Sequence, residues 1–71
     1  MLEGMKWHKF TATYTEDNTK YSWFFVRCKK SGYWLLKDYN GYIRCLEKNW
    51  LDSVPRIMTI LDNHGMTAKI S

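Results

Sequence analysis

The spacing of three short polar turns constrains this chain more than any other feature of its sequence. The turns are Asp17-Asn18, Ser31-Gly32 and Asn40-Gly41. They separate four segments rich in aromatic and β-branched residues, which cover residues 7–14, 21–28, 33–38 and 42–47. Such composition favours strands, and the connections are too short for parallel crossovers. The sequence therefore predicts an antiparallel meander of four strands.

The residues after position 49 follow a helical period instead. Apolar side chains recur there at i, i+3, i+4 and i+7, namely Val54, Ile57, Met58 and Leu61. We expect Ser53 to cap the amino end of this helix, with Pro55 in the first turn, where its missing N–H costs nothing. Gly65 is expected to end the helix in a left-handed conformation.

An apolar helix stripe needs a sheet face to cover, so the predicted fold class is α+β. We expect a single small domain over residues 1–71, a four-stranded antiparallel β-meander with one C-terminal α-helix packed on one face. Residues 1–5 and 66–71 are expected to be frayed tails. Aromatic residues make up 17% of the 71-residue chain, which lets so short a chain build a core.

The lengths of the turns predict which residues share a face of the sheet. A two-residue loop at Asn40-Gly41 places Tyr39 opposite Tyr42 and Lys37 beside Arg44. If Tyr14 lies opposite Tyr21, one face collects the predicted core beneath the helix: Phe10, Ala12, Trp23, Phe25, Trp34, Leu36, Ile43 and Cys45.

The opposite face combines basic and aromatic residues and is predicted to contain no Asp or Glu. The chain carries a net charge of +4, with 11 Lys and Arg against seven Asp and Glu. Cations replace the counterions of phosphates, and flat rings stack on bases. The predicted binding residues, including two lysines that follow the second strand, are Lys9, Phe24, Lys29, Lys30, Tyr33, Lys37, Tyr39, Tyr42, Arg44 and Lys48.

The leading hypothesis is a small basic, non-enzymatic protein that binds nucleic acid, DNA or RNA, through this face. The alternative is a small interaction protein, of the type that phages and mobile elements encode, that binds and inhibits a host protein through the same surface. A complete single-domain frame from Met1 suits that alternative. Two further hypotheses are that the face forms a homodimer interface, or that it holds an anionic small molecule between protomers.

The sequence offers little for catalysis, so we expect no enzyme activity, metal site or cofactor. His8 and His64 lie near opposite ends of the chain, and no CxxC, HExxH or glycine-rich phosphate loop occurs. Cys28 and Cys45 are predicted on opposite faces as separate thiols. Without an apolar run long enough for a membrane span or signal peptide, the chain is expected in the cytoplasm.

Overall fold

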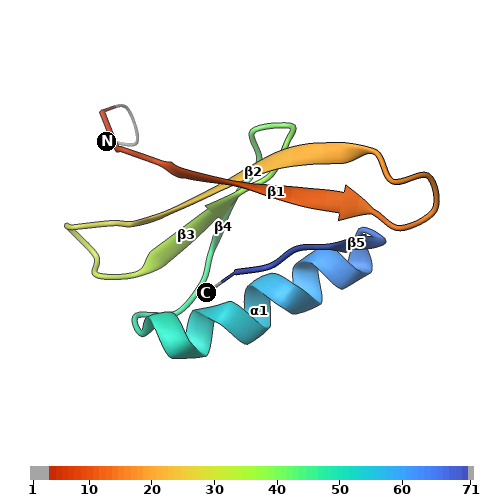
Figure 1. Ribbon diagram of the computed structural model, residues 1–71. Coiled ribbons are helices and arrows are strands. Elements are labelled where there is room, and N and C mark those ends of the chain that lie inside the picture. Colours follow the sequence, from red (N-terminus) through yellow and green to blue (C-terminus); the bar gives the residue numbers. More distant parts are fainter. Residues whose placement is uncertain (1–3, 71) are drawn as a thin grey trace.

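Each of the four aromatic-rich segments forms a strand, and a fifth strand follows the helix. The computed structural model describes residues 4–70. Its elements, shown in Figure 1, are β1 (His8–Tyr14), β2 (Lys20–Arg27), β3 (Trp34–Lys37), β4 (Ile43–Cys45), α1 (Trp50–Asn63) and β5 (Met66–Thr67). The strands form one antiparallel sheet in the order β4-β3-β2-β1-β5. The α+β class is confirmed, but the sheet has five strands instead of the predicted four.

The fifth strand corrects the prediction that the carboxyl-terminal tail is frayed. Gly65, with φ of 69°, turns the chain after α1, as predicted. Thr67 then pairs with Thr13 and Met66 with Tyr14, at the end of β1. Met66 is buried in the core. A two-residue strand lacks the alternation that would reveal it in the sequence. At the other end of the chain, residues 1–3 of the predicted amino-terminal tail lie outside the described residues.

The helix begins one turn earlier than predicted. Asn49 is its N-cap, and the Asn49 side chain accepts a hydrogen bond of 2.8 Å from the Leu51 N–H. Ser53 is fully buried within the helix, where its Oγ accepts from the Glu47 N–H at 3.1 Å and lies 3.0 Å from the Asn49 carbonyl. The predicted cap thus ties the helix to the chain that enters it. Pro55 consequently lies within the helix rather than in its first turn.

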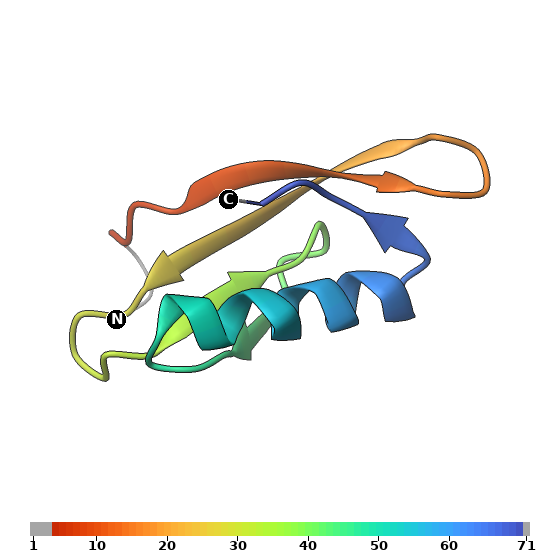
Figure 2. The ribbon, with the colours of Figure 1, turned by 60° about the horizontal axis from the view of Figure 1, so that its bottom comes forward.

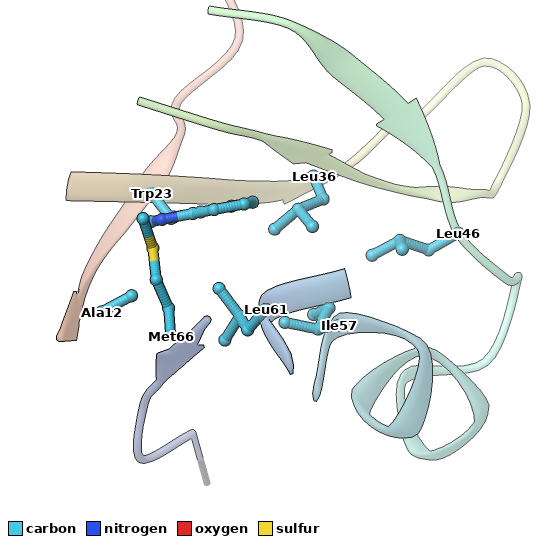
Figure 3. Packing of buried hydrophobic residues seen from close by; sticks show 7 residues of the cluster. All are labelled: Ala12, Trp23, Leu36, Leu46, Ile57, Leu61 and Met66. Carbon is cyan, nitrogen blue, oxygen red and sulfur yellow. The ribbon is translucent and has the colours of Figure 1, made fainter. Parts of the chain in front are cut away.

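The core lies between α1 and one side of the sheet. Figure 2 shows α1 running along this side of the curled sheet, and Figure 3 shows the side chains that fill the space between them: Ala12, Trp23, Leu36, Leu46, Ile57, Leu61 and Met66. Burial of large apolar side chains contributes most of the free energy that stabilises so small a domain. Within residues 4–70, no helix has the length and apolar composition needed to cross a bilayer.

The hairpin between β3 and β4 differs from the predicted one by a single residue. Its loop holds three residues rather than two, because the Asp38 N–H bonds the Tyr42 carbonyl at 3.0 Å. Gly41, with φ of 86°, takes the left-handed position that ends such a loop. Strand β4 therefore pairs Cys45 with Leu35, Arg44 with Leu36 and Ile43 with Lys37. A shift of one residue exchanges the two faces of a strand, so β4 is reversed relative to the prediction.

The other two hairpins keep the predicted faces. Phe25 pairs with Leu36 and Arg27 with Trp34 across β2 and β3. Tyr21 pairs with Ala12 instead of Tyr14, a difference of two residues along β1. Because side chains alternate with a period of two, that difference leaves every side chain of β1 on its predicted face.

Candidate functional site on the open face of the sheet

The side of the sheet opposite α1 is left uncovered by the elements of residues 4–70, as Figure 2 shows. We call it the open face. Strands β1 to β4 contribute alternate residues to it, and its central members are Lys9, Thr11, Phe24, Val26, Leu35, Lys37, Ile43 and Cys45. None of these central residues is Asp or Glu. The predicted absence of acidic groups from this face is therefore found at its centre.

A row of paired residues crosses the open face at right angles to the strands. Lys9 pairs with Phe24, Phe24 with Lys37, and Lys37 with Ile43. Neighbouring strands are about 4.8 Å apart, so the backbones of Lys9 and Lys37 are separated by roughly 10 Å. The row thus places one lysine on each side of an aromatic ring.

Aromatic rings position two of the lysines at this face. The Lys37 Nζ lies 4.5 Å from the centroid of the Trp7 ring and 4.9 Å from that of Phe24. The Lys48 Nζ lies 5.4 Å from the centroid of Tyr33. A ring attracts a cation through its quadrupole without neutralising its charge. These contacts therefore orient the two ammonium groups on the open face.

Seven of the ten predicted binding residues lie on the open face or beside it. Five of them have just been placed by pairing or by ring contacts: Lys9, Phe24, Tyr33, Lys37 and Lys48. Lys29 and Lys30 are exposed in the turn that follows β2. Their role in binding stays a prediction, and the geometry establishes their position only.

Three predicted binding residues lie elsewhere, because the three-residue loop includes Tyr39 and reverses the faces of the residues that follow it. The Tyr39 ring packs 4.6 Å from that of Tyr21 and 6.0 Å from that of the core residue Trp23, measured between centroids. The Arg44 guanidinium stacks 4.6 Å from the centroid of Tyr42 and lies 3.2 Å from the Asp38 carboxylate. The prediction that Arg44 adjoins Lys37 on one face is wrong.

Two residues that were predicted in the core lie on the open face instead of these three. Ile43 and Cys45 pair with Lys37 and Leu35 and so lie on the open face, whereas Leu46 is buried in the core. Cys28 and Cys45 consequently share a face, contrary to the prediction, and both are free thiols. Strand β3 lies between them, and Cys28 is two residues beyond the register position of Cys45. Their Cα atoms are therefore more than about 10 Å apart, beyond the reach of a disulfide.

Asp38 organises the tip of the reversed hairpin. Its Oδ1 accepts hydrogen bonds from the N–H groups of Asn40 at 2.8 Å and Tyr42 at 3.0 Å, while Arg44 pairs with Oδ2. Burial opposes ionisation of this carboxyl group, but the hydrogen bonds from Tyr42 and Asn40 and the Arg44 charge outweigh it and lower the Asp38 pKa. The charge of Arg44 thus forms an ion pair within the hairpin.

The exposed surface of α1 differs sharply from the open face. Asp52 and Asp62 are exposed there, and the exposed Arg56 forms an ion pair of 3.0 Å with Glu47. A helix that reads a major groove needs several cations and amides on its exposed side. This surface therefore offers little to an anionic partner.

The two histidines have structural contacts. The His8 ring lies 5.2 Å from that of Phe25, and His64 packs edge-on against Trp23 with its Nδ1 2.9 Å from the Ile60 carbonyl. Within residues 4–70, His, Cys, Asp and Glu form no group of three or more that could hold a metal ion. Both histidine rings thus take part in the packing of the fold.

Comparison with known proteins leaves the site to be judged on its own geometry. No family model, curated protein or solved structure matches this chain. The function is therefore inferred from the geometry of the open face.

Proposed function

We propose that this protein binds nucleic acid through the open face. The observation that carries the proposal is the row Lys9, Phe24 and Lys37, in register on a sheet face whose centre contains no acidic residue. Like charges on one face repel one another and favour an anionic partner. Binding to phosphates relieves that repulsion and releases the counterions that the phosphates hold.

The two kinds of side chain on the open face have separate tasks in this proposal. Lys9, Lys37 and Lys48 contact phosphates, and their contribution falls as salt is added. Phe24 and Tyr33 are half-buried, and their remaining exposed surface offers a platform for bases or sugars. Unpaired bases stack on such rings with little regard to sequence, which favours single strands over duplexes as ligands.

The salt dependence of binding tests this proposal. The affinity of the full chain for a mixed-sequence 20-nucleotide single strand is measured by fluorescence anisotropy at several salt concentrations. Three to four phosphate contacts predict a slope of log K against log salt of about −2 to −3. A duplex of the same sequence serves as the second probe. Absence of binding at low salt, or an affinity that does not change with salt, would contradict the proposal.

A protein interface is the second candidate, because the centre of the open face is apolar. Val26 is only 8% exposed, Leu35 and Ile43 are half-buried beside it, and Cys45 is exposed. Apolar patches surrounded by polar residues are typical of surfaces that bind proteins. In this reading the protein binds, and by covering a surface inhibits, another protein.

The variant Cys45→Lys separates the two candidates. Residue 45 is exposed, so the change is expected to leave the fold intact. An additional cation steepens the salt slope for a nucleic acid by about 0.7 to 0.9. The same cation at the centre of an apolar protein interface weakens capture of the partner protein, and nuclease treatment leaves that capture unchanged.

A further inference from the structure

A basic hollow lies at the end of the sheet where β1 begins and β2 ends. It encloses about 700 Å³, and four cationic side chains line it: Lys6, Arg27, Lys29 and Lys30. His8 and Trp34 form part of its wall, and the lining contributed by residues 4–70 contains neither Asp nor Glu. Four cations thus line one concave space.

No acidic partner within residues 4–70 neutralises these four cations. The ion pairs of that part of the chain join Arg44 to Asp38 and Arg56 to Glu47, and none of these four residues lines the hollow. Gathering four unpaired cations around one concave space costs free energy through mutual repulsion. An anionic ligand would remove that cost.

The aromatic part of the wall belongs to a larger group of rings. His8 lies 5.2 Å from Phe25, Phe25 lies 6.1 Å from Trp34, and Trp34 lies 4.6 Å from Trp50, between ring centroids. The packing of Trp34 against two other rings fixes its orientation, yet Trp34 remains only half-buried. A fixed, partly exposed indole is a suitable surface for a flat ring of a ligand.

The turn after β2 adds hydrogen-bond donors beside the cations. Cys28 also lines the hollow. The Ser31 hydroxyl, the Ser31 N–H and the Lys30 N–H lower the pKa of its thiol by favouring the negative form. The surroundings of this thiol thus favour negative charge beside the hollow.

We propose that this hollow binds a nucleotide, with its phosphate at the four cations and its base against Trp34 and His8. The hollow combines cations that can bind an anion with a wall of flat aromatic rings. A nucleotide combines an anionic phosphate and a flat base in one molecule. A free mononucleotide and the 5′-terminal nucleotide of a strand present the same groups. The inference stands apart from the proposed function, because it uses residues at the end of the sheet and not the central row.

Calorimetric titration of the full chain with AMP and with adenosine tests the site. We expect AMP to bind at least tenfold more tightly than adenosine, because one charge-assisted hydrogen bond corresponds to about a tenfold change in affinity. Lys30→Gln should weaken AMP binding about tenfold. The matched control Lys20→Gln removes the same charge from the opposite end of β2 and should leave AMP binding unchanged. Equal loss in both variants would overturn the proposal.

A single strand with and without a 5′-phosphate distinguishes the two sources of the nucleotide. Preference for the phosphorylated strand, lost in Lys30→Gln, supports the site with a strand end as its ligand. AMP binding without such a preference supports the site with a free nucleotide as its ligand. Absence of both AMP binding and the preference overturns the proposal. Lys37→Gln should weaken binding of the strand but not of AMP, so failure of this site and failure of the open face are separable.

Discussion

The two faces of the sheet are built from the same strands and have opposite properties. Trp23 and Leu36 point toward α1 and are completely buried, whereas their neighbours Phe24 and Leu35 lie on the open face and are half-buried. Adjacent residues of one strand thus have different tasks. The side chains that point toward α1 are buried by packing against it. Those on the open face keep exposed surface that a partner could contact. We therefore expect stability to depend mainly on the helix-covered face and the proposed binding to depend on the open face.

The largest expected effect concerns the helix-covered face. Leu36→Ala and Ile57→Ala should each lower the free energy of unfolding by about 2 to 5 kcal/mol, because both side chains are completely buried. Leu35→Ala, on the open face, should cost about 1 kcal/mol or less. Urea denaturation of the three variants measures the difference. Equal losses for Leu35 and Leu36 would mean that the open face is packed as tightly as the core.

Asp38, at the tip of the hairpin between β3 and β4, provides the next largest effect. Asp38→Asn should lower the free energy of unfolding by about 1 to 3 kcal/mol. The change replaces a buried carboxylate that accepts two backbone hydrogen bonds and forms an ion pair with Arg44. Denaturant midpoints at pH 7 provide the comparison with the wild-type chain. A loss below about 0.5 kcal/mol would contradict the role of Asp38 in the hairpin.

The same contribution depends on pH with a defined sign. The folded-state pKa of Asp38 is lower than its ordinary value of 3.8, so the unfolded chain binds a proton first as pH falls. The stabilisation is complete well above pH 3.8 and is lost as pH falls through the lower folded-state pKa. The stability difference between the wild-type chain and Asp38→Asn should therefore shrink in that range. A difference that grows on acidification would contradict this assignment.

A smaller effect separates the two faces by their charges. Lys37→Gln removes a cation from the open face and should reduce the salt slope of nucleic-acid binding by about 0.7 to 0.9. Arg44→Gln makes the same change in net charge on the other face, where Asp38 is its partner, and should leave the slope unchanged. If both variants flatten the slope equally, net charge and not the face governs binding.

The smallest effect is expected at Cys45. The residue is exposed on the open face, so Cys45→Ser should change the free energy of unfolding by no more than about 0.5 kcal/mol. Its thiol should also react with iodoacetamide in the native protein. Protection of Cys45 until the protein unfolds would place it in the core and restore the register in which β4 has the opposite faces.

The helix-covered face could be predicted from the sequence to a large extent. The composition of β2 and β3 identified them as strands. The register between β1 and β2 differed from the prediction by two residues, an even number, so Trp23, Phe25 and Leu36 were still assigned to the correct face. The β4 residues could not be placed, because Asn40-Gly41 suits both a two-residue and a three-residue loop. The Asp38 side chain favours the longer loop by accepting hydrogen bonds from Asn40 and Tyr42, and a dipeptide signal does not include that third residue.

The candidate site was accordingly predicted in part. Lys9, Phe24 and Lys37 come from strands whose faces were correct, while Tyr39, Tyr42 and Arg44 were misplaced by the hairpin. The basic hollow could not be found from the strand pattern. Lys6 lies outside every predicted strand, and the residues that surround the hollow meet only when β1 and β2 pair. Alternation within a strand gives no information about such a site.

The most direct test of the open face as a nucleic-acid interface is a nuclear magnetic resonance titration of the ¹⁵N-labelled chain with a mixed-sequence single strand. Binding at this face predicts that the backbone amide signals of Lys9, Phe24 and Lys37 shift progressively, whereas those of Asp52, Arg56 and Thr59 on the exposed side of α1 do not. Shifts confined to α1, or no shifts at low salt, would contradict it.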